Sequence, residues 1–97
     1  MQSMNKLLDK FSRRTYNSLK KDGVYRVILK LESNQALFLL FLDSDPSTED
    51  CTKLELKYQR IFSDDPDFKI KVIPKTNTVN LNHECYSVWR QETGYIL

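Results

Sequence analysis

The hydrophobic period of this sequence changes from helical to alternating at Gly23, which limits the chain to folds that combine a helix with a sheet. Before that point, apolar residues recur every three or four positions, which predicts an amphipathic helix over residues 3–22. Ser3 is the expected N-cap, and Gly23 supplies a left-handed stop. After it, apolar and polar residues alternate over residues 24–32, as in a half-buried strand.

The later apolar segments predict the rest of a four- to five-stranded antiparallel sheet. Residues 36–42 are apolar on both faces, which indicates a central strand in a hairpin with the strand before it. A third strand is expected at 68–72 and ends at Pro74. A fourth is expected to start at Val79, and residues 85–89 either continue it or form a fifth.

A second helix is predicted at 46–62, with a strand as the alternative for the same segment. Asp45 is the expected N-cap and Pro46 the first helical residue. Good helix formers favour the helix, but charged and apolar residues also alternate over residues 53–58, as they would in a strand. The length allows one hydrophobic core, so we expect one α+β domain over residues 1–97.

Charge is distributed unevenly along the chain, although the formal net charge is only +2. Residues 1–22 hold six basic and two acidic side chains, whereas residues 43–67 hold three basic and eight acidic ones. The basic residues of the first helix repeat at helical spacing on the side opposite the apolar stripe. This outer stripe predicts a partner-binding surface made of Lys10, Arg13, Arg14, Asn17 and Lys21.

Most enzyme classes lack their sequence signatures here. With two glycines in the chain there is no glycine-rich phosphate loop, and no G-x-S-x-G motif is present. A single histidine, His83, leaves few groups for acid-base chemistry near neutral pH. His83, Glu84 and Cys85 with Cys51 lack the spacing of a zinc site. We therefore expect no enzymatic activity, no metal and no cofactor.

The apolar segments and the cysteines favour an intracellular, cytoplasmic protein. The longest apolar run, residues 36–42, is much shorter than the roughly 20 residues that cross a bilayer. No uncharged run in the first twenty residues resembles a signal peptide. Cys51 and Cys85 are too few for a disulfide scaffold, and the sequence leaves open whether they pair with each other.

Three functions are compatible with these features. The favoured one is a protein-interaction module, such as an adaptor, a regulatory subunit or an inhibitor of a larger protein, with a basic helix face and an acidic lobe. The alternative is nucleic-acid binding through the same helix stripe and the basic residues of the strands. Those residues are Arg26, Lys30, Lys69, Lys71 and Lys75, with Tyr25, Phe68, Tyr86 and Trp89 as stacking groups. The third is a metal-dependent hydrolase at Asp43 and Asp45. The partner and the oligomeric state are not specified.

Overall fold

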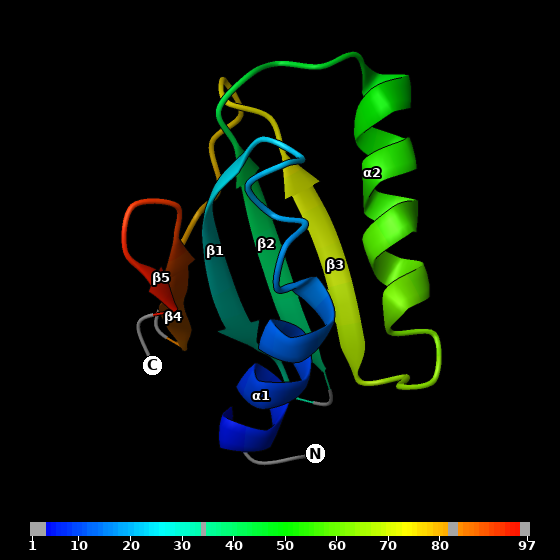
Figure 1. Cartoon of the computed structure of the whole chain (residues 1–97), viewed down its shortest axis with the longest axis vertical. Helices are drawn as coiled ribbons and strands as arrows, with labels where there is room; N and C mark the ends of the chain where they lie inside the picture. The colour runs from blue at the N-terminus through cyan, green and yellow to red at the C-terminus, as the bar shows by residue number, and fades with distance from the viewer. Residues whose placement is uncertain (1–3, 34, 82–83, 96–97) are drawn as a thin grey trace.

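The structure is a computed structural model that describes residues 4–33, 35–81 and 84–95. Its strands form one sheet in the order β3-β2-β1-β4-β5, and both helices pack on the same face of it (Figure 1). The predicted α+β class, with the N-terminal helix on the sheet, is confirmed. The elements along the chain are α1 (Met4–Thr15), β1 (Val24–Leu31), β2 (Ala36–Leu42), α2 (Thr48–Ile61), β3 (Phe68–Ile73), β4 (Cys85–Arg90) and β5 (Gly94–Tyr95).

The sheet is mixed, which corrects the prediction of a purely antiparallel one. β1 pairs with β2 as the expected hairpin, but β2 and β3 run parallel, from Ala36 opposite Phe68 to Phe41 opposite Ile73. The reason is α2, which connects these two strands along the chain and returns it to the end of the sheet where β2 began. Alternation of apolar residues predicts a strand but not the direction in which it pairs.

The first helix is shorter than predicted. It ends at Thr15, and residues 16–23 form turns that lead into β1. Leu19 belongs to these turns and is buried in the core, which explains why its helical spacing suggested a longer helix. Its carbonyl accepts the backbone N–H of Val24. Gly23 has the predicted left-handed conformation, with φ of 77°. The expected cap Ser3 lies outside the described residues.

The second helix is confirmed, and the strand alternative is wrong for this segment. The N-cap is Ser47, whose hydroxyl accepts the backbone N–H of Asp50 at 3.1 Å, rather than the predicted Asp45. Asp45 Oδ1 instead accepts the backbone N–H and the hydroxyl of Thr76, at 2.8 and 2.9 Å. Both residues are good caps, so sequence alone does not choose between them.

Four stacked phenylalanine rings form the centre of the core between the helices and the sheet. The ring centroids of Phe11 and Phe38 are 4.2 Å apart, and those of Phe62 and Phe68 are 4.5 Å apart. The two pairs also stack on each other, so α1, β2, β3 and the end of α2 meet in one aromatic cluster. Such ring contacts add roughly 0.5–1.5 kcal/mol per pair to the burial of their area.

The other face of the sheet is crossed by the connection between β3 and β4. These strands run in the same direction, so the connection has to return to the end of the sheet where β3 began before β4 can start. Its Val79 packs on a buried apolar cluster of Ile28, Leu39 and Ile73. The strand predicted from Val79 is wrong, because this residue serves as a contact across the face and β4 begins at Cys85.

The outer edge of β3 is covered by side chains of α2. Gln59 accepts the backbone N–H of Ile70 and donates to the carbonyl of Phe68, both at 2.9 Å. Glu55 accepts the N–H of Val72 at 3.1 Å. Backbone groups that would otherwise be free to pair with another strand are therefore satisfied within the domain.

Candidate interaction surfaces

Two residues of the predicted basic stripe are held in ion pairs with the turn that follows α2. Lys10 Nζ lies 2.7 Å from Oδ2 of Asp65, a carboxylate that is only 6% exposed. Arg14 donates to both oxygens of Asp64, at 2.6 and 3.1 Å, and to the carbonyl of Ile61 at 2.9 Å. The basic helix and the acidic turn, which lie far apart in the sequence, thus neutralise part of each other's charge.

The same two cations also lie over the aromatic core. Lys10 Nζ is 5.5 Å from the centroid of the Phe68 ring, and Arg14 Cζ is 5.7 Å from that of Phe62. At these distances the ring faces attract the cations. Lys10 and Arg14 therefore have contacts that stabilise the fold, whatever else they bind.

The Arg14–Asp64 pair changes the acidity of both groups. The hydrogen bond from Arg14 lowers the pKa of Asp64 to about 2, and the same bond raises the pKa of Arg14. Asp64 is exposed, so solvent screens this pair and its carboxylate is ionised at neutral pH.

The remaining predicted residues converge on one hollow of about 570 Å³ beside the end of α1. Arg13 and Arg14 reach it from the helix, and Asn17 and Lys21 from the turns that follow. We call this the basic hollow; its other lining residues are Tyr16, Ser18, Asp22 and Lys57. Four of the five predicted residues are therefore brought together, while Lys10 lies in a neighbouring hollow that shares Arg13 and Arg14.

One side of the basic hollow is fixed by a contact that the sequence did not reveal. Asp22 Oδ2 accepts hydrogen bonds from Lys57 Nζ and from the hydroxyl of Tyr58, both at 2.7 Å. Burial is the main reason that the pKa of Tyr58 is raised well above its ordinary value. Lys57 and Asp22 are thirty-five positions apart, so only the packing of α2 beside the turns brings them together.

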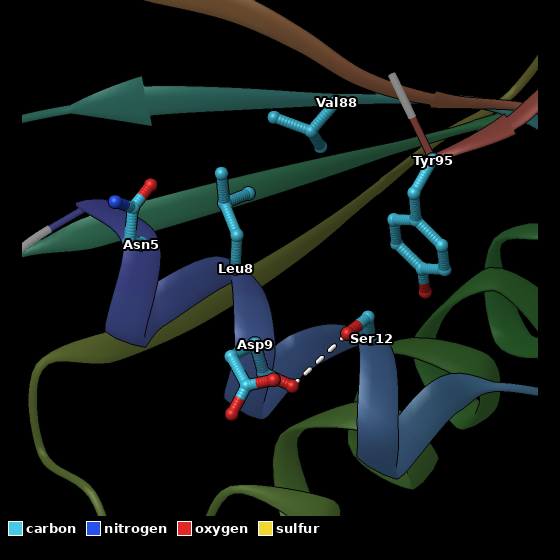
Figure 2. A pocket seen from close by; sticks show the side chains of 6 residues that line it. All are labelled: Asn5, Leu8, Asp9, Ser12, Val88 and Tyr95. Carbon is cyan, nitrogen blue, oxygen red and sulfur yellow. Dashed lines mark hydrogen bonds between the residues drawn. The ribbon is translucent and has the colours of Figure 1, made fainter. Parts of the chain in front are cut away.

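A second, smaller hollow of about 250 Å³ lies between α1, β4 and β5 (Figure 2). Leu8, Val88 and Tyr95 provide its apolar part, and Ser12 donates to the carbonyl of Asp9 at 3.0 Å at its rim. Asn5 completes its lining, so these six residues include no histidine, cysteine or basic side chain. This hollow therefore offers no cation for an acidic partner, and its Ser12 hydroxyl donates to a backbone carbonyl rather than to a side-chain base.

The structure divides the surface predicted for nucleic acid between two sides of the sheet. The helix stripe lies on the helix side of the sheet. The strand residues lie on the opposite face, because their Cα partners on β2 belong to the apolar cluster of that face; these strand residues are Arg26, Lys30, Lys69 and Lys71. Lys75 is exposed in the connection after β3. Among the proposed stacking residues, Phe68 and Trp89 are buried, while Tyr25 and Tyr86 are exposed.

The remaining chemical candidates are separated from one another. In the ranges that the structure describes, no group of three His, Cys, Asp or Glu side chains is arranged to hold a metal, and His83 lies outside those ranges. Cys51 and Cys85 are free thiols that pack against clusters on opposite faces of the sheet, so they do not form the disulfide that the sequence left open. The hydrolase at Asp43 and Asp45 stays a prediction.

Comparison with protein-family models gave no match, and comparisons with curated proteins and with solved structures gave no significant one. Neither of the described helices is long and apolar enough to cross a membrane.

Proposed function

We propose that this domain is a non-enzymatic protein-interaction module whose partner places acidic side chains in the basic hollow. The observation that carries the proposal is the convergence of Arg13, Asn17 and Lys21 with Arg14 on one concave surface. A regulatory subunit or an inhibitor of a larger protein would use such a surface. Its cytoplasmic setting is part of the proposal and is supported by the two free thiols.

The chemistry of the hollow favours an acidic protein surface as its ligand. The Arg13 side chain is 78% exposed, and its only ion pair in the described part of the chain is with Asp9, one turn earlier at 3.2 Å. Such exposed pairs contribute at most a few tenths of a kcal/mol, so exchanging Asp9 for a carboxylate of a partner costs little. Within the same ranges, Lys21 has no ion pair at all.

Tyr16 adds an anchor to this charged rim. Its side chain is 78% exposed, although it is a large aromatic group, and it lines the basic hollow together with the arginines and Lys21. Tyrosine and arginine dominate the energetics of many protein interfaces, because they combine apolar area with hydrogen bonding. The cations would steer the partner, and Tyr16 would supply buried area.

Affinity capture from the native source, followed by quantitative mass spectrometry, tests this proposal. The variant Arg13→Glu with Lys21→Glu should lose the partner that the wild-type domain retains. The matched control is Lys69→Glu with Lys71→Glu, which makes the same charge change on exposed residues of β3, across the sheet. A partner captured equally by both variants would refute the assignment to the basic hollow.

A further inference from the structure

The sheet carries charge of a single sign. Its five strands contain five charged residues, and all five are basic. They are Arg26 and Lys30 on β1, Lys69 and Lys71 on β3, and Arg90 on β4. A sheet that served only as scaffold would gain nothing from this bias, since basic side chains placed near one another repel.

The strand register places all five cations on the face that the helices leave uncovered. Side chains at directly paired positions of neighbouring strands project to the same face of a sheet. On β2, the residues that face away from the helices are Leu37, Leu39 and Phe41. Lys30 and Lys69 both pair with Leu37, and Lys71 pairs with Leu39. Arg26 pairs with Phe41 on one side and with Arg90 on the other. Val79 packs on the apolar cluster of this same face.

These five side chains differ from those of α1 in having no acidic partner. In the described parts of the chain, none of them takes part in an ion pair, whereas Lys10 and Arg14 are both paired. Arg26 makes one long hydrogen bond, at 3.5 Å, to Ser87 Oγ. Arg26 and Arg90 occupy directly paired positions of β1 and β4, and two cations so placed favour a ligand that is itself a chain of negative charges.

An exposed aromatic ring lies beside the two arginines. Tyr25 sits at a bulge in the β1–β2 pairing, which turns it away from the core face that alternation predicts for it. The side chain is 42% exposed, and its ring meets that of Phe41 edge to face at 6.4 Å. Its exposed ring is therefore available to stack on a flat ligand group.

We propose that this face binds single-stranded nucleic acid, with a base on Tyr25 and phosphates at Arg26, Arg90, Lys69 and Lys71. Stacking beside unpaired cations is the chemistry by which proteins hold single strands, whose bases are free of a complementary strand. β3 and β4 are three strand spacings apart, about 14 Å, which a few nucleotides span. This activity goes beyond the protein-binding role and uses the opposite side of the molecule.

Fluorescence anisotropy with a labelled single strand of about 12 nucleotides, as DNA and as RNA, tests the proposal against a duplex of the same sequence. With four phosphate contacts, affinity for the single strand should fall about 50-fold between about 50 and 200 mM salt. It should also exceed affinity for the duplex. Absence of salt-sensitive binding, or preference for the duplex, would overturn the assignment.

Variants locate the surface within the same assay. Lys69→Gln with Lys71→Gln should weaken binding and reduce its salt dependence, while Tyr25→Ala should weaken it about fivefold or more. Lys20→Gln with Lys53→Gln is the matched control, on exposed residues outside the sheet, and should leave binding unchanged. Lys69 and Lys71 are exposed, so their substitution leaves the core intact. This variant therefore tests the surface even if Tyr25→Ala does not fold. Equal loss in the control, or tighter binding of poly-glutamate than of the oligonucleotide, would contradict the proposal.

Discussion

Asp65 is a carboxylate buried against the aromatic core, and its surroundings explain why the fold tolerates it. One oxygen accepts the backbone N–H of Asp67 at 3.0 Å and so shapes the turn after α2, while the other receives Lys10. Lys10 in turn lies over the Phe68 ring. The Asp65 carboxylate therefore joins α1 to the turn after α2, although β1, β2 and α2 lie between them in the sequence.

Substituting Lys10 should reveal this tether. Lys10→Met keeps much of the apolar stem but removes the ammonium group from a buried carboxylate, so the free energy of unfolding should fall by about 1.5–3 kcal/mol. Urea unfolding followed by circular dichroism measures it. Arg13→Met is the control on the same helix, and its exposed ion pair predicts a change within about 0.5 kcal/mol. Equal losses in the two variants would argue against a special role for Lys10.

Tyr58 predicts a loss of stability in alkali. Burial raises the pKa of its phenol in the folded protein, so its contribution is complete below about pH 10, the ordinary value, and is lost as the pH rises above it. Unfolding free energies measured from pH 8 to 11 should show this decline. Tyr58→Phe, which cannot ionise, should show a shallower decline, although it loses the hydrogen bond to Asp22 at every pH. Identical slopes would disprove the linkage.

Helix α2 has two roles, because it covers the core with one side and the edge of β3 with another. Gln59 and Glu55 occupy the backbone groups through which an edge strand would pair with a second molecule. Tyr58, from the same helix, holds the turns after α1 through Asp22. The position of α2 therefore protects the sheet and fixes one wall of the basic hollow.

Gln59→Ala should expose the edge of β3. The loss of two hydrogen bonds to the backbone should lower the free energy of unfolding by about 1–3 kcal/mol and favour self-association. Denaturant unfolding and light scattering at increasing concentration report the two effects. Lys53→Ala, on the same helix, removes only an exposed pair with Glu49 and should change neither. A monomeric Gln59→Ala of wild-type stability would contradict the role given to this side chain.

The contact between α1 and the acidic turn predicts a weakness in acid. The pKa of Asp64 is lowered by Arg14, so the stability it confers is present above about pH 4, its unfolded value, and is lost as the pH falls through about 2. Acid unfolding of Asp64→Asn should therefore be less steep than that of the wild type between these values. An unchanged profile would show that solvent screens the pair completely.

Sequence patterns predicted those features that depend on local chemistry. The helix beginning near Met4, the switch at Gly23 and the buried β2 follow from the spacing of apolar residues, and the second helix followed from its helix-forming residues. The parallel pairing of β3 escaped prediction, because it is decided by how α2 crosses the sheet. The same holds for the site: the grouping of Arg13, Asn17 and Lys21 was visible in the sequence, but the pairing of Lys10 and Arg14 with residues some fifty positions away was not.

The molecule as a whole has two cationic surfaces of different kinds. On the helix side, positive charge is partly neutralised by Asp64 and Asp65, and what remains surrounds the basic hollow. On the other side, the cations of the sheet have no acidic partner among the described residues. We assign the first surface to an acidic protein and the second to single-stranded nucleic acid.

Site-specific photocrosslinking tests whether the basic hollow binds a protein partner. Tyr16 is replaced by the photoreactive analogue benzoylphenylalanine, which keeps an aromatic ring at the basic hollow, and Tyr25 is replaced in the same way as the control on the far side of the sheet. We expect light to produce a covalent adduct with a specific protein from position 16 and none with that protein from position 25. An adduct with the same protein from position 25 alone would contradict it.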